Sequence, residues 1–133
     1  MAGVAYIDSS ALVKLVVREP ETSALEADLA DRPGLITSHL AVLECRRAAR
    51  RSKAARLLHT FDAVVEALYL LDITPALLDH AARADPATLR ALDAIHLATA
   101  LSLDEPDLEL ITYDDRLAEA ARASGLTVVQ PGR

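Results

Sequence analysis

The sequence is poor in cysteine and in aromatic residues. Its 133 residues include one cysteine, Cys45, so no disulfide framework can form within the chain, and a reducing compartment is indicated. Aromatic residues make up 3% of the chain and tryptophan is absent, so a platform of rings that stacks on nucleic-acid bases is not expected. A small secreted domain held together by disulfides is therefore excluded.

Long hydrophobic runs are also missing. No apolar run approaches the roughly 18 residues that cross a bilayer. No basic stretch leads into an apolar run at the N-terminus, where Asp8 stands, so a signal peptide is not expected. With 52% hydrophobic residues and no repeat, low-complexity segment or linker, residues 1–133 are predicted to form a single globular domain in the cytoplasm.

The formal net charge is −6, which by itself argues against a nucleic-acid partner because phosphate repels acid. The charge is unevenly distributed, however. One short stretch gathers six basic residues, namely Arg46, Arg47, Arg50, Arg51, Lys53 and Arg56. If several acids bind cations together, their region also loses its negative character.

Apolar runs alternate with helix signals along the whole chain. Strands are predicted at residues 3–7, 35–37, 69–73, 108–112 and 128–129. Helices are predicted from Ser9–Ser10 to near Pro20, over 21–30, from the cap Ser38 past Glu44, over 52–68, from Thr74 to about 85, from about 90 past Ala98, and over 114–124 with Gly125 as its stop. This alternation predicts an α/β sandwich around a mostly parallel sheet.

Two acids follow predicted strands. Asp8 comes directly after the first strand, and Asp114 comes two residues after Thr112. Because the carboxyl ends of parallel strands meet at one sheet edge, both acids are expected there. Glu44 and Asp93 lie on predicted helices that could flank this edge, and each stands among apolar neighbours where a lone charge is costly to bury.

Each of these acids has a structural alternative. Asp8 and Asp114 could be helix caps, Asp93 could serve the first turn of its helix, and Glu44 could be a solvated residue beside the arginines. Taken together, four crowded carboxylates repel one another unless hard divalent cations such as Mg²⁺ or Mn²⁺ compensate them. Such ions favour hydrolysis of a phosphate ester.

Neighbouring polar residues could support these acids. Thr112 could hold a ligand carboxylate or a water, or be an ordinary strand residue; Ser9 and Asp115 could act in the same way or belong to helix starts. His96 lies one helical turn after Asp93, and a packed, hydrogen-bonded histidine is expected rather than a general base.

Four segments carry a family resemblance. They are Tyr6-Ile7-Asp8-Ser9-Ser10-Ala11-Leu12-Val13-Lys14, Leu43-Glu44, Leu92-Asp93-Ala94-Ile95-His96-Leu97-Ala98-Thr99-Ala100 and Ile111-Thr112-Tyr113-Asp114-Asp115-Arg116-Leu117. The chain resembles PIN-domain ribonucleases over nearly its whole length, and more narrowly the VapC-type toxins of bacterial toxin–antitoxin pairs. Asp93 and Asp8 stand in the most specific segments, whereas the match around Glu44 is short.

The resemblance implies a three-layer α/β/α sandwich that cuts RNA endonucleolytically. It implies that Asp8, Glu44, Asp93 and Asp114 bind Mg²⁺ or Mn²⁺, that a cognate antitoxin blocks the site, and that the chain forms a homodimer or a larger complex with the antitoxin. On a helix, Arg46, Arg50 and Lys53 share one face near Glu44 and could contact RNA phosphates, form a solvated surface, or meet an acidic antitoxin segment.

Three other functions compete with this reading. A phosphatase could use Asp8 as a nucleophile, although haloacid-dehalogenase-type enzymes have a second acid two residues later, where this chain has Ser10. A nucleotide-binding module lacks its glycine-rich loop, because no glycine follows the first strand. A non-catalytic domain that binds a partner is the third alternative.

Overall fold

Five short parallel strands form a single sheet at the centre of the molecule. The computed structural model describes residues 3–52 and 56–133. The elements in chain order are β1 (Ala5–Ile7), α1 (Ser9–Leu12), the 3-10 helix η1 (Val13–Leu15), α2 (Thr22–Ala30), β2 (Leu35–Ser38), α3 (His39–Arg51), α4 (Leu57–Glu66), β3 (Tyr69–Leu71), α5 (Pro75–Ala82), α6 (Ala91–Leu101), β4 (Glu109–Ile111), α7 (Asp115–Ala123) and β5 (Thr127–Val129). The strand order is β3-β2-β1-β4-β5, and every neighbouring pair is parallel.

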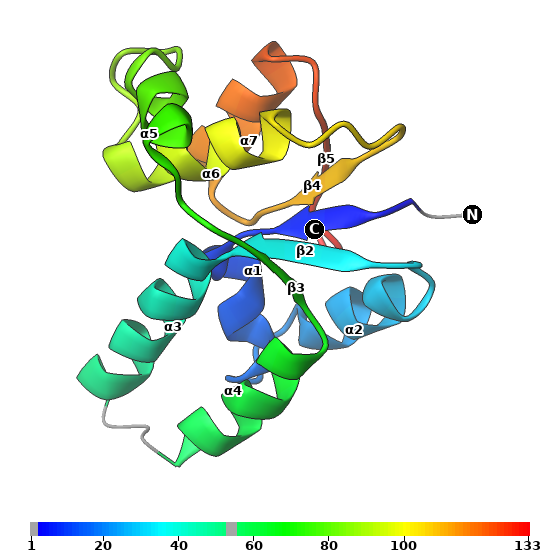
Figure 1. The fold of residues 1–133 in the computed structure, drawn as a ribbon. Coiled ribbons are helices and arrows are strands. Elements are labelled where there is room, and N and C mark those ends of the chain that lie inside the picture. Colours follow the sequence, from blue (N-terminus) through cyan, green and yellow to red (C-terminus); the bar gives the residue numbers. More distant parts are fainter. Residues whose placement is uncertain (1–2, 53–55) are drawn as a thin grey trace.

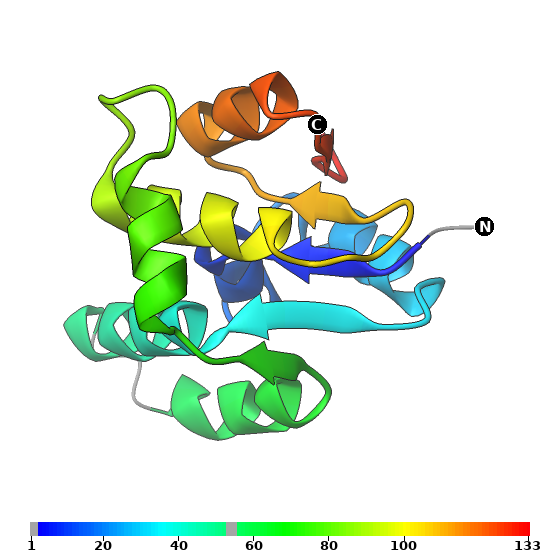
Figure 2. The same cartoon turned by 45° about the horizontal axis from the view of Figure 1, so that its top comes forward.

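Helices cover both faces of the sheet, which gives three layers. Helices α1 to α4 lie on one face, and α5, α6 and α7 lie on the other (Figures 1 and 2). The central strand β1 is buried on both faces: Ala5 and Ile7 pack into one apolar cluster, whereas Tyr6 packs into the other. The predicted α/β/α sandwich with a parallel sheet is therefore confirmed.

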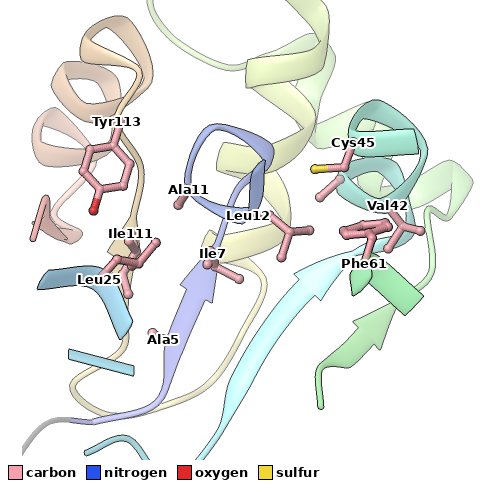
Figure 3. Close-up of a cluster of buried hydrophobic side chains, with 11 residues drawn as sticks. Ala5, Ile7, Ala11, Leu12, Leu25, Val42, Cys45, Phe61, Ile111 and Tyr113 are labelled. Atoms are coloured by element: carbon pink, nitrogen blue, oxygen red, sulfur yellow. The ribbon is translucent and has the colours of Figure 1, made fainter. Parts of the chain in front are cut away.

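The cluster beneath α1 joins elements that are distant in the sequence. Ile7 from β1, Leu12 from α1 and Phe61 from α4 are almost completely buried in it, and Cys45 from α3 lies among them (Figure 3). The single cysteine is thus a small buried side chain. This cluster fixes α1 and α3 against the carboxyl end of β1.

The predicted helix starts and stops are largely confirmed. The hydroxyl of Ser38 accepts a hydrogen bond from the Leu40 amide, and that of Thr74 accepts one from the Leu77 amide. After α7, Gly125 adopts a left-handed backbone with φ of +91°, where glycine lacks the strain of other residues.

Two predicted helices are wrong in length. The first was expected to reach Pro20, but α1 ends at Leu12 and η1 ends at Leu15. Here the Thr22 hydroxyl donates to the Lys14 carbonyl and accepts from the Glu19 amide, so local hydrogen bonds replace further helical turns. The helix expected over 52–68 begins only at Leu57.

The chain changes direction across the sheet at β1. From β1 it proceeds outward to β2 and β3, then crosses to the other side of β1 and forms β4 and β5. The carboxyl ends of β1 and β4 therefore flank the point where the strand order reverses, which is where open α/β sheets place their binding sites. Among the described residues, no helix is both long and apolar enough to cross a membrane.

Candidate active site

A pocket of about 270 Å³ lies at this reversal point, and four carboxylates line it. Asp8 follows β1, Glu44 belongs to α3, Asp93 lies in the first turn of α6, and Asp114 precedes α7. Ser9, Ser10 and Arg90 line the same pocket. A larger pocket, of about 780 Å³, lies against α7 and contains none of the four acids. Four segments far apart in the sequence thus converge on the smaller one.

Asp8 is the most buried of the four acids, with 2% of its surface exposed. Its Oδ1 accepts from the Ser10 hydroxyl at 2.7 Å and from the Ala11 amide at 3.1 Å, and its Oδ2 accepts from the Thr112 hydroxyl at 2.6 Å. Burial raises the pKa of the Asp8 carboxyl above its ordinary value, and the hydrogen bond from Thr112 is the strongest opposing effect. These donors hold the carboxylate in one orientation.

The end of β4 connects Asp8 with Asp114. The Thr112 hydroxyl that donates to Asp8 also accepts from the Asp114 amide at 3.1 Å. The Oδ1 of Asp114 caps α7 by accepting from the amides of Arg116 and Leu117 at 2.9 and 3.1 Å. Asp8 likewise caps α1. Capping and lining the pocket are therefore compatible roles, since each carboxylate has two oxygens.

Asp93 carries the clearest sign of crowding among the acids. Its pKa is raised first by burial, then by the charge of Asp114, and to a smaller extent by Asp8 and Glu44. The His96 ring acts in the opposite direction. A positive ion between these acids would relieve the same repulsion.

Glu44 is held by a buried histidine. Its Oε1 lies 2.7 Å from Nε2 of His96, and Nδ1 of that ring lies 2.8 Å from the Tyr6 hydroxyl. His96 is 1% exposed. The expectation of a packed, hydrogen-bonded histidine is confirmed.

The donor chemistry of the pocket fits a hard divalent cation. Within residues 3–52 and 56–133, no three His, Cys, Asp or Glu side chains already stand close enough to hold one ion directly. Mg²⁺, however, usually keeps several waters and takes only one or two protein carboxylates. A pocket lined by four carboxylates matches that mode, in which waters complete the coordination.

Of the other predicted site residues, some lie at the pocket and others do not. Thr112 contacts Asp8 directly, Ser9 lines the pocket, and exposed Asp115 lies 3.6 Å from Arg133. The Arg46 guanidinium lies 3.3 Å from Asp62 of α4. Further along α3, Arg50 is exposed, and Lys53 falls outside the described residues. No residue of this basic run lines the acidic pocket in the part of α3 that the structure describes.

Two residues were not predicted for this site. Ser10, which sequence reasoning treated only as a helix cap, supplies the hydroxyl that contacts Asp8. Arg90 immediately precedes α6 and lines the pocket. Ser10 could have been found from its position two residues after Asp8, a common spacing for local side-chain hydrogen bonds. Arg90 gave no such signal, because it is an isolated arginine far from the basic run.

Comparison with known proteins agrees with this geometry. The model of the PIN domain family matches residues 5–123. Ribonuclease VapC46 of Mycobacterium tuberculosis (strain ATCC 25618 / H37Rv) is 43% identical, with 95% of this chain and 96% of the relative covered. Ribonuclease VapC35 of the same strain is 42% identical, with 96% and 97% covered.

Solved structures show the same fold. The toxin VapC20 of Mycobacterium tuberculosis, described as cleaving the sarcin-ricin loop, superposes with a TM-score of 0.75 at 18% identity, with 96% of this chain and 99% of that chain covered. A toxin–antitoxin complex from Klebsiella pneumoniae gives 0.71 at 24% identity, with 96% and 97% covered. The chain belongs to the PIN-domain family, within its group of VapC ribonucleases.

Proposed function

We propose that this chain is a Mg²⁺- or Mn²⁺-dependent endoribonuclease that hydrolyses phosphodiester bonds in RNA. The observation that carries the proposal is the convergence of Asp8, Glu44, Asp93 and Asp114 on one pocket at the sheet reversal point. The relatives named as ribonucleases at 43% and 42% identity support RNA as the substrate. The cation would activate a water and stabilise charge on the phosphodiester.

The chain's own residues prepare the pocket. Ser10 and Thr112 fix Asp8 in one orientation, so its carboxylate loses little conformational freedom when it binds a ligand. Asp114 keeps its Oδ2 available while its Oδ1 caps α7. Burial and the charge of Asp114 raise the pKa of Asp93, so a neutralising partner favours its charged form.

Arg90 is the cationic residue placed to contact the substrate. It is exposed, and it lines the pocket beside Asp93 at the start of α6. An arginine beside four carboxylates can bind a phosphate that the carboxylates alone would repel. We therefore assign Arg90 to phosphate binding at the cleaved nucleotide, and propose that Arg46 and Arg50 contact a more distant part of the RNA.

We further propose that the chain is the toxin of a toxin–antitoxin pair in the cytoplasm, where a cognate antitoxin inhibits it, and that it forms a homodimer or a larger complex with the antitoxin. Support comes from structural neighbours of the same fold, two of which are described as DNA-bound VapBC from Rickettsia felis and from Salmonella typhimurium.

The rival phosphatase mechanism fits the site less well. The second acid of the haloacid-dehalogenase pattern is absent, since the residue at that position is Ser10.

Cleavage assays with the antitoxin-free protein test the proposal. We expect structured RNA to be cut with Mg²⁺ or Mn²⁺ and left intact with chelator. Asp8→Asn and Asp93→Asn should each lower the cleavage rate by roughly 100-fold or more, because several kcal/mol of charge stabilisation is lost.

Asp79→Asn is the matched control, because Asp79 is 74% exposed and its carboxylate pairs only weakly with Arg83 at 3.8 Å. This control should cut RNA at the wild-type rate. Cleavage that survives in folded Asp8→Asn and Asp93→Asn would refute the site. Release of inorganic phosphate from small esters without RNA cleavage would support the phosphatase instead.

A further inference from the structure

A hydrogen-bonded chain connects the core of the sheet with the acidic pocket. It starts at Tyr6 in β1, passes through His96 in α6 and ends at Glu44 in α3. Tyr6 and His96 are 0% and 1% exposed, whereas the Glu44 side chain is 24% exposed and lines the pocket. Three elements from distant parts of the sequence meet in this chain.

The chemistry of the three groups gives the chain a direction. The Glu44 carboxylate only accepts hydrogen bonds, so Nε2 of His96 must carry the proton between them. In the neutral form of the ring, which has one N–H, Nδ1 then accepts from the Tyr6 hydroxyl, 2.8 Å away. The phenol of Tyr6 has an O–H that can donate to that nitrogen.

We infer that Tyr6 and His96 are positioning residues that hold the Glu44 carboxylate in its ligand orientation by fixing the Nε2–H form of the histidine ring. This inference rests on the proposed function of the same site. With Oε1 bound to His96, the carboxylate is pinned, and its other oxygen has no hydrogen bond among the described contacts. Ligand carboxylates in metal sites are commonly held by such outer hydrogen bonds.

The hydrogen bonds among Tyr6, His96 and Glu44 also explain why the polar groups of Tyr6 and His96 are tolerated in the core. Every buried side-chain nitrogen and oxygen among the described residues has a hydrogen-bond partner. Removing the Tyr6 hydroxyl would leave Nδ1 of His96 without its partner at a fully buried position, which destabilises the ring orientation that contacts Glu44.

The first test reads the histidine ring directly. A ¹⁵N spectrum of the ring nitrogens of the metal-free wild-type protein at pH 8 should show the His96 proton on Nε2 and none on Nδ1. A proton bound to Nδ1 overturns the inference, because that nitrogen would then donate to Tyr6 instead of accepting.

The second test measures Mn²⁺ affinity by electron paramagnetic resonance on variants whose fold is verified by circular dichroism. His96→Leu should weaken Mn²⁺ binding roughly tenfold or more, the loss typical of removing an outer partner. Tyr6→Phe should weaken it by a smaller factor, and His96→Gln, which keeps an N–H donor, should bind more tightly than His96→Leu.

The matched control is Tyr113→Phe, which removes a buried tyrosine hydroxyl that donates only to the Pro131 carbonyl, at 2.8 Å, among the described contacts. It should leave Mn²⁺ affinity unchanged even if it lowers stability. Wild-type affinity in folded Tyr6→Phe and His96→Leu overturns the inference. If His96→Leu does not fold, Tyr6→Phe and the ring spectrum still decide.

Glu44→Gln separates this inference from the proposed function. If Glu44→Gln weakens Mn²⁺ binding but the Tyr6 and His96 variants do not, only the positioning role is wrong. If Glu44→Gln itself binds Mn²⁺ like the wild type, Glu44 is no ligand and the positioning role fails, whereas the ribonuclease function is decided by Asp8→Asn and Asp93→Asn. When the positioning role holds, adding His96→Leu to Glu44→Gln causes no further loss, because the two residues act through one contact.

Discussion

At the scale of single residues, the site consists of acids that do two tasks at once. Asp8 and Asp114 cap helices with one oxygen and face the pocket with the remaining acceptor capacity. A carboxylate held by such a cap is costly to charge when buried but already oriented. The metal-free protein therefore gives up some stability for its function.

Asp93→Asn tests whether an acid of the site lowers the stability of the metal-free protein. The pKa of Asp93 is raised in the folded protein by burial and then by the charge of Asp114. Its contribution to stability is therefore complete below the unfolded pKa of about 4 and is lost as the pH rises through the folded pKa. In chelator at pH 7, Asp93→Asn should raise the melting temperature by roughly 2 °C, and the gain should vanish near pH 3.5.

The position of Asp93 in the first turn of α6 has the opposite effect on stability, because a helix N-terminus stabilises a negative charge. A melting temperature that falls at pH 7 would mean that this effect outweighs burial and repulsion. In excess Mn²⁺ the order should reverse, since only the wild type gains the full stabilisation of ion binding. Thermal scans of the wild type and of Asp93→Asn at two pH values, with and without Mn²⁺, measure these differences in melting temperature.

At the scale of elements, hydrogen bonds at the ends of helices decide where the pocket residues stand. Helix α7 starts at its cap, Asp114. After its end, the Gly125 amide donates to the Arg122 carbonyl and the Leu126 amide donates to the Ala121 carbonyl. The start of this helix therefore contributes Asp114 to the pocket, whereas its end contributes only to the stability of the fold.

Gly125→Ala should separate stability from activity. The backbone of Gly125 has a φ of +91°, and nothing lies within 4 Å of an added Cβ, so the cost is conformational strain alone. We expect a loss of about 1 kcal/mol in the free energy of unfolding. RNA cleavage at 25 °C should be unchanged. Urea denaturation measures the loss in the free energy of unfolding. Loss of RNA cleavage in the folded variant would contradict the expected activity.

At the scale of the whole molecule, the net charge of −6 opposes RNA while local charges can favour it. Arg46→Glu combined with Arg50→Glu should weaken RNA binding more than Mn²⁺ binding, and should lower the slope of log affinity against log salt by about 1 for each lost phosphate contact. RNA affinity that stays unchanged across a salt series would refute a role for this helix face.

A charge-matched control is available on other surfaces. Arg18→Glu combined with Arg122→Glu changes the net charge by the same amount at two exposed residues that do not line the acidic pocket. If this control weakens RNA binding as much as the pair on α3, the effect comes from net charge and not from a specific contact.

Much of the fold could be predicted from the sequence because its signals are local. The apolar runs mark all five strands, and Ser38, Thr74 and Gly125 mark helix ends through hydrogen bonds to near neighbours. The length of the first helix could not be predicted, because Thr22 ends it from eight residues away.

The site divides in the same way. The sequence by itself determined the four acids and the sheet edge at which they meet, since strand ends and helix starts follow from apolar patterns and caps. Only the tertiary structure decided that Thr112 orients Asp8, that Arg90 and not the α3 arginines borders the pocket, and that Tyr6 holds His96 against Glu44. The hydrogen bonds among these contacts join residues 52 to 104 positions apart and depend on how the layers pack, and packing leaves no periodic trace in a single sequence.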